Sequence, residues 1–101
     1  MIIQLYCSAG MSTSMLVKKM RDEAEKRGLD AQINAYQFDQ IADKVKEADV
    51  AFLGPQVQFQ LKAAQKEADK YNVALEVIPM KDYGMMNGKA VLDRALELCK
   101  K

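Results

Sequence analysis

Residues 2–20 read IIQLYCSAGMSTSMLVKKM, and the pattern of apolar residues in this segment predicts the fold class of the chain. Residues 2–6 form a short apolar run, which is typical of a buried strand. Residues 12–27 repeat apolar side chains at helical spacing, and one face of this predicted helix carries Leu16, Val17, Met20 and Ala24. A strand that passes through a short small-residue loop into an amphipathic helix predicts the start of a β-α-β unit.

The same alternation continues along the remaining sequence. Further strands are predicted at 31–36, 50–53 and 73–78, and further helices at about 41–45, 56–70 and 90–99. Gly28 is expected to end the first helix in a left-handed conformation. Strands that alternate with helices pair in parallel through right-handed crossovers. We therefore predict a single α/β domain over residues 1–101, an open four-stranded parallel sheet with helices on both faces.

Two predicted helices carry clear apolar faces. In the helix over 56–70 this face is formed by Val57, Leu61, Ala64 and Ala68. In the last helix the apolar stripe includes Cys99, which is therefore expected to be a packed, inert thiol. The strand over 50–53 ends at Gly54 and Pro55, a pair that suits a turn into the first turn of a helix.

Composition excludes several classes of function. The 101 residues are 50% hydrophobic and 29% charged, which is typical of a folded globular chain. Fifteen Lys and Arg nearly balance fourteen Asp and Glu, so no overall field attracts nucleic acid or anionic lipid. No signal peptide or membrane span is evident, and we expect a soluble cytoplasmic protein without direct membrane insertion. Histidine is absent, and neither a metal nor a cofactor is expected.

Cys7 opens the loop that follows the first predicted strand. Ligands of open α/β sheets bind at the carboxyl ends of the strands, so this loop is the expected site. Its small side chains would let backbone N–H groups form an anion cradle at the start of the helix. The predicted phosphate-binding residues are Ser8, Ala9, Gly10, Met11, Ser12, Thr13 and Ser14.

The same cradle would favour the thiolate of Cys7. The pKa of a thiol falls at a helix N-terminus, and the thiolate is the nucleophile. Attack of this sulfur on phosphorus would give S-phosphocysteine, with the cradle neutralising the phosphoryl oxygens. From the residues alone, a buried cysteine that serves as a small hydrophobic side chain fits equally well.

Residues 7–20 closely resemble the corresponding segment of the enzyme IIB component of the lactose and cellobiose type sugar phosphotransferase system. Residues 53–57, and Tyr83 with Gly84 and Gly88, resemble two later loops of that family. The resemblance extends over essentially the whole chain. It implies a phosphocysteine at Cys7, a phosphohistidine of enzyme IIA as donor, and an acceptor sugar held by membrane enzyme IIC. The family's usual acceptor is a β-linked disaccharide such as cellobiose.

Three alternative functions use the same loop. Low-molecular-weight tyrosine phosphatases have a similar fold and loop, but their pattern places Arg at the position of Thr13, and a hydroxyl cannot replace the guanidinium fork. Asp82 could be their general acid, although a turn residue is the simpler interpretation. A thiol redox module would need a resolving cysteine, and Cys-x-x-Cys spacing is absent. A binding module without chemistry is the third alternative.

Several other residues are predicted to lie near Cys7. We expect Met11, Met85 and Met86 to form an apolar rim that partner proteins cover, because methionine adapts to several partners. Packing of Met85 and Met86 against the last helix is an equal alternative. Gln56 and Tyr83 follow the third and fourth strands, so both could reach the same crevice. The charged residues Lys18 and Arg21 are expected to lie on a solvated helix face.

Overall fold

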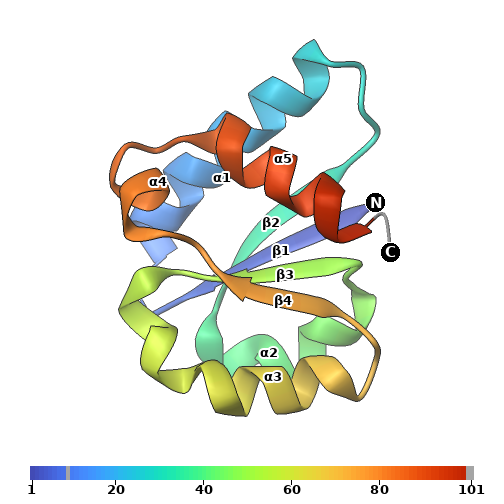
Figure 1. Cartoon of the computed structure of the whole chain (residues 1–101), viewed down its shortest axis with the longest axis vertical. Coiled ribbons are helices and arrows are strands. Elements are labelled where there is room, and N and C mark those ends of the chain that lie inside the picture. The colour runs from blue at the N-terminus through green and yellow to red at the C-terminus, as the bar shows by residue number, and fades with distance from the viewer. Residues whose placement is uncertain (9, 100–101) are drawn as a thin grey trace.

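In the computed structural model, which describes residues 1–8 and 10–99 and the side chains of all of these except residues 10–12, four strands form one parallel sheet (Figure 1). Their order is β2-β1-β3-β4, with bounds β1 (Ile2–Cys7), β2 (Gln32–Gln37), β3 (Val50–Leu53) and β4 (Ala74–Val77). Ile3 pairs with Ile33 of β2 and with Val50 of β3, so β1 is an inner strand. The predicted parallel sheet is confirmed.

Helices cover both faces of this sheet, as predicted (Figure 1). One face is covered by α1 (Gly10–Lys26) and α5 (Gly88–Cys99), and the other by α2 (Ile41–Lys44) and α3 (Leu61–Asp69). The short helix α4 (Met80–Gly84) follows β4. Short 3-10 segments complete the connections at Phe38–Gln40, Val45–Glu47 and Pro55–Gln60.

The sheet divides the apolar core into two clusters. Ile3 and Leu5 pack toward α1 and α5, whereas Tyr6 packs toward α2 and α3, and all three are fully buried. Gln4 is buried beside Tyr6, whose hydroxyl donates to Gln4 Oε1, while Gln4 Nε2 donates to the carbonyl of Lys44 at 2.8 Å. Burial, with a smaller effect of neighbouring charge, raises the pKa of Tyr6. These bonds satisfy polar groups that would otherwise destabilise the core.

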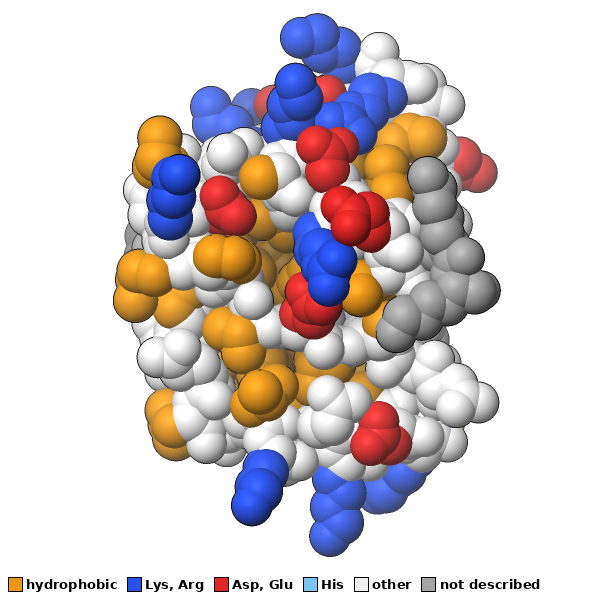
Figure 2. Space-filling model, in the orientation of Figure 1, with side chains coloured by type: hydrophobic (Ala, Val, Ile, Leu, Met, Phe, Trp, Pro, Cys, Tyr) orange, Lys and Arg blue, Asp and Glu red, His pale blue; other side chains and the backbone are white. Residues whose placement is uncertain are grey.

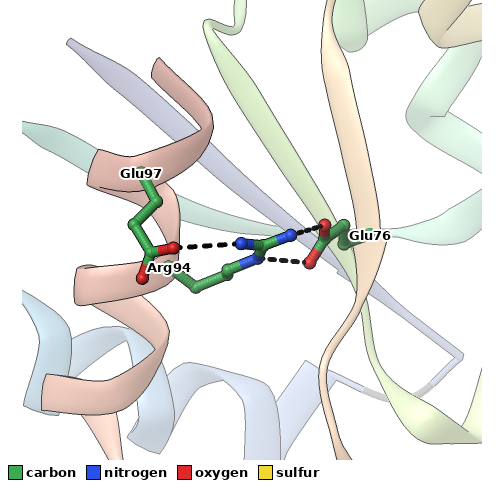
Figure 3. A network of polar contacts seen from close by, with 3 residues as sticks. All are labelled: Glu76, Arg94 and Glu97. Atoms are coloured by element: carbon green, nitrogen blue, oxygen red, sulfur yellow. Dashed lines mark hydrogen bonds and ion pairs between the residues drawn. The ribbon is translucent and has the colours of Figure 1, made fainter. Parts of the chain in front are cut away.

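An ion-pair network links α5 to the edge strand β4 (Figure 3). The guanidinium of Arg94 spans both carboxylate oxygens of Glu76, with Nε donating to Oε1 at 2.8 Å, and Nη1 lies 3.1 Å from Glu97. The hydrogen bond to Glu76 is the main cause of the raised pKa of Arg94. This two-pronged contact fixes the position of α5 along β4 more precisely than a single ion pair would.

The boundaries of some elements differ from the prediction. α1 begins at Gly10, so the loop after β1 is shorter than expected, while Gly28 adopts the predicted left-handed conformation with φ 69°. The predicted helix over 56–70 is interrupted, because Val57 has φ −116° and ψ 17°, and α3 begins only at Leu61. Leu61 is 38% exposed rather than part of the buried face. The helix α4 was not predicted.

Candidate functional site

Cys7 is the last residue of β1, at the carboxyl end of the sheet. β2 lies on one side of β1 and β3 on the other, so the crossovers after β1 and β2 diverge at this point. Such a switch point is where open α/β sheets bind ligands. The side chain of Cys7 is fully buried. The predicted nucleophile thus lies at the expected place in the fold, beneath the surface of the crevice.

Gly54 borders Cys7 on the side of β3. Its N–H donates to the carbonyl of Tyr6 at 2.8 Å, which extends the ladder between β1 and β3 by one residue. A Cβ at Gly54 would lie 3.4 Å from Cys7 Cβ and 2.7 Å from Gln56 Oε1. The side chain of the exposed Gln56 therefore lies next to Gly54, which in turn borders Cys7, and the missing side chain at Gly54 leaves room for it.

The start of α1 follows Cys7 after two residues. Ser8 is exposed, and Ala9 lies outside the described residues. Gly10, Met11 and Ser12 form the first turn of α1 rather than a loop, and their side chains lie outside what the structure describes. First-turn N–H groups have no partner within their helix, and the helix dipole favours an anion near them. The N–H groups of the first turn of α1 are therefore the donors that the predicted cradle would use, because α1 begins earlier than expected.

The side chains of Thr13 and Ser14 lie in different surroundings, one buried and the other exposed. Thr13 is fully buried, and its Oγ1 lies 3.2 Å from the hydroxyl of Tyr83, which is 6% exposed. Tyr83 comes from α4, so this contact joins the start of α1 to the chain after β4. Ser14 is exposed and lines a shallow hollow with Gln37 and Asp39 beyond the end of β2. The Thr13 hydroxyl is thus held in position by a residue from another element.

Cys99 does not lie in the core, contrary to the prediction. It is exposed at the end of α5, with its Sγ 3.4 Å from Met1 Sδ. The buried face of α5 ends at Leu98, because the helix runs past the amino end of β1 there. Cys7 lies at the other end of β1, roughly 20 Å away along the strand. Disulfide geometry needs two Cα atoms within about 7 Å, so Cys99 cannot resolve an oxidised Cys7 in this fold.

The predicted methionine rim is wrong for Met85 and Met86. Both line a hollow with Lys19 and Glu23 in the middle of α1. Lys19 lies nine residues beyond Gly10, or about 14 Å along the helix. Met85 is 70% exposed there, while Met86 packs against the core. The side chain of Met11 lies outside the described part.

Other apolar side chains surround the carboxyl end of the sheet. Figure 2 shows hydrophobic side chains gathered on the left of the molecule, where α4 lies in Figure 1. Three of the large exposed side chains from the segments after β1, β3 and β4 are here called the apolar rim: Met15, Phe59 and Met80, at 59%, 78% and 67% exposure. None of the three was predicted to lie at this end of the sheet, although they follow the ends of their strands by three to eight residues.

The structure also shows where Asp82, Arg21 and Lys18 lie. Asp82 lines a small hollow with Val91 and Arg94, beside α5. The neighbouring Tyr83 is the residue that faces Thr13. Arg21 is exposed, as predicted, and it donates to the carbonyl of Ile33 at 2.7 Å, which anchors α1 to β2. Lys18 pairs with Asp22 on the exposed side of α1.

The described part of the chain contains neither a metal-binding cluster nor a membrane-spanning helix. No cluster of three or more His, Cys, Asp or Glu side chains there is arranged to hold a metal ion. No helix among those residues is both long and apolar enough to cross a membrane.

Fold and site together define a small doubly wound α/β protein with a buried thiol at the ligand-binding end of its sheet. Residues 2–94 match the family model described as the lactose/cellobiose-specific IIB subunit of the PTS system. The chain belongs to this family. It is therefore a sugar phosphotransferase component, as the resemblance implied.

Individual relatives agree with this family. The chain is 46% identical to the oligo-beta-mannoside-specific EIIB component of Bacillus subtilis (strain 168), over 95% of this chain and 93% of the relative. It is 42% identical to the galactose-specific EIIB component of Lactococcus lactis subsp. cremoris (strain MG1363), over 96% and 94%. A solution structure of the cellobiose-specific IIB component from Borrelia burgdorferi is 36% identical with a TM-score of 0.83, over 99% and 92%. The sugars in these three names differ.

Proposed function

We propose that Cys7 is the phosphoryl carrier of a cytoplasmic relay. It accepts the phosphoryl group from a phosphohistidine of enzyme IIA and passes it to a sugar held by membrane enzyme IIC. The observation that supports this most strongly is the place of Cys7, at the switch point of the sheet and two residues before the first turn of α1. Phosphate groups bind at helix N-termini because free N–H groups and the dipole act together there.

Each transfer in this proposal is a displacement at phosphorus. In the first, the Cys7 thiolate forms an S–P bond while the P–N bond of the donor breaks, and the histidine nitrogen keeps the electron pair. In the second, a sugar hydroxyl forms an O–P bond and loses its proton to a base of the acceptor protein, while the sulfur leaves as thiolate. The cradle stabilises the charge on the three phosphoryl oxygens in both steps.

The burial of Cys7 places a requirement on the first step. A donor must reach a sulfur atom that is covered in the structure described here. The exposed amide of Gln56 lies over Gly54 beside this thiol, and a long exposed side chain can move at little cost. We assign to Gln56 the role of a movable cover, which turns away when the donor docks and can then donate its amide N–H to the phosphoryl group.

The apolar rim supplies a docking surface next to this cover. One partner must bring a phosphoryl group to this sulfur and the other must receive it, so both must dock around the carboxyl end of the sheet. Phe59 and Met80 are large and exposed, and aromatic and methionine side chains are enriched at protein interfaces. A single apolar rim can serve both partners in turn because methionine adapts its shape.

The sugar in this proposal is a β-linked disaccharide or oligosaccharide such as cellobiose. Support comes from the names of the B. subtilis and B. burgdorferi relatives, which specify oligo-beta-mannoside and cellobiose. The sequence identity of the galactose-specific relative to this chain, 42%, lies between the identities of those two relatives. Sugar choice is therefore assigned to the membrane component rather than to residues of this chain.

A transfer assay tests the relay with three versions of the protein: native, Cys7→Ser and Cys99→Ser. Each is incubated with phosphorylated enzyme IIA, analysed by intact mass, and then mixed with membranes that contain enzyme IIC and radiolabelled cellobiose. We expect one added phosphoryl group and labelled sugar phosphate with the native and Cys99→Ser proteins, and neither with Cys7→Ser. An adduct that persists in Cys7→Ser, or slow release of inorganic phosphate without sugar phosphate, would contradict the relay and favour a phosphatase-like activity.

A further inference from the structure

Thr13 and Tyr83 form a buried pair of hydroxyl groups beside the candidate site. Their oxygens are 3.2 Å apart, and the two residues are separated by 70 positions in the chain. Thr13 is fully buried and Tyr83 nearly so. The bonding of these two hydroxyls affects stability, because polar groups lose their bonds to water on burial.

One of the two O–H groups in this pair has no acceptor within the pair. Thr and Tyr each carry one O–H group, and the bond between them uses one of the two protons. No second hydrogen bond to either hydroxyl is found in the part of the chain that the structure describes. A buried O–H without an acceptor is costly. The spare proton is therefore available to an acceptor that arrives with a ligand.

The backbone directs the Thr13 hydroxyl toward the start of α1. Thr13 is the fourth residue of this helix, and helical side chains lean toward the N-terminus of their helix. The branched side chain of Thr has few rotamers, and its bond to Tyr83 selects one of them. Tyr83 is itself held in the core cluster with Leu16 and Ile78. The hydroxyl is thus held at the same end of α1 as Cys7.

We infer that Thr13 donates this spare proton to the phosphoryl group on Cys7, and that Tyr83 is the positioning residue that holds the Thr13 hydroxyl in place. This inference rests on the proposed function. The phosphoryl oxygens supply the missing acceptor, and the proton stays on the hydroxyl throughout. The pair thus occupies, with neutral donors, the position after the loop at which the phosphatase pattern places a cationic Arg.

Phosphorus NMR of the phosphorylated protein provides the test. A donor to the phosphoryl dianion favours the charged form and lowers the second pKa of the phosphoryl group. All variants carry Cys99→Ser so that Cys7 is the sole thiol. Thr13→Val should raise this phosphoryl pKa by roughly 1, and Tyr83→Phe by roughly half as much, since each weakens a donor to an anion. The double variant should match Thr13→Val alone, because Tyr83 acts through Thr13.

Two controls separate positioning from stability. Thr13→Ser keeps the hydroxyl and should restore the native phosphoryl pKa. Tyr71→Phe removes an exposed hydroxyl elsewhere and should leave it unchanged. An unchanged phosphoryl pKa in Thr13→Val and in Tyr83→Phe, or shifts that add in the double variant, would overturn the inference. If Cys7 of the parent protein takes up no phosphoryl group at all, the proposed function itself fails.

Discussion

The two ends of the sheet each carry a cysteine, and their surroundings are opposite in character. At the carboxyl end Cys7 is fully buried, with the first turn of α1, Gly54 and Gln56 around it. At the amino end Cys99 is exposed beside a hollow of about 620 Å³ that also contains Asp49 and Asp69. The more accessible of the two thiols, and this hollow beside it, are thus at the end of the sheet where we expect no phosphoryl transfer.

Accessibility alone therefore does not identify the reactive thiol in this fold. Partial burial, followed by the nearby carboxylate of Asp49, raises the pKa of Cys99, so its thiol stays protonated. A thiol is a poor nucleophile and its thiolate a good one. At the carboxyl end no acidic residue lies within the segment 7–14, and the free N–H groups of α1 favour an anion.

The largest effect is expected from filling the space beside Cys7. Gly54→Val would place side-chain atoms against Cys7 Cβ and the Gln56 amide. Displacing the reacting sulfur or its donor by about 1 Å should slow transfer from enzyme IIA roughly 100-fold. Stopped-flow transfer kinetics would measure this, with the melting temperature recorded to exclude unfolding. Gly84→Ala is the matched control, since no atom lies within 4 Å of a Cβ there, and equal rates in both variants would refute a tight site around Cys7.

A smaller effect is expected from the apolar rim at the carboxyl end. Phe59→Ala removes a side chain that is 78% exposed, so the fold should keep its stability. Loss of one anchor from an interface should raise KM for phosphorylated enzyme IIA roughly tenfold with little change in kcat. Tyr71→Ala provides the comparison, because Tyr71 is also exposed but lies in the turn before β4, at the amino end. The docking assignment fails if Tyr71→Ala impairs transfer as much as Phe59→Ala.

The smallest effect concerns the reactivity of Cys99 with pH. In a Cys7→Ser background, alkylation of Cys99 by iodoacetamide should follow a pKa above the ordinary thiol value, because burial and Asp49 disfavour the thiolate. Near pH 8 the folded protein should then react more slowly than the unfolded chain. Asp49→Asn, which keeps an acceptor for the N–H of Ile2, should partly restore the rate. A folded protein that reacts faster than the unfolded chain would contradict the assigned cause.

Much of this architecture could be predicted from the sequence, because local patterns determine it. The spacing of apolar residues in 2–20 predicts β1 and α1, and Gly28 marks the end of α1 as its φ confirms. The interruption at Val57 could not be predicted in this way. Apolar residues keep their helical spacing through Val57, and the spacing carries no information about the backbone angles of a single residue. Helix α4 has five residues, too few for a periodic signal.

In the candidate site, too, some residues could be placed from the sequence and others could not. Cys7 could be placed because it ends a strand that is visible in the sequence. The contact between Thr13 and Tyr83 joins residues 70 positions apart and depends on how α4 packs against α1. The exposure of Cys99 depends on where α5 outruns the sheet, which helical spacing does not reveal.

The most direct test of the central claim is the phosphorus NMR spectrum of the protein after phosphorylation by enzyme IIA. We expect one resonance in the range of sulfur-bound phosphorus, present in the native and Cys99→Ser proteins and absent in Cys7→Ser. A resonance from phosphorus bound to oxygen or nitrogen, or a sulfur-bound signal that disappears with Cys99→Ser instead, would contradict the assignment of Cys7 as the carrier.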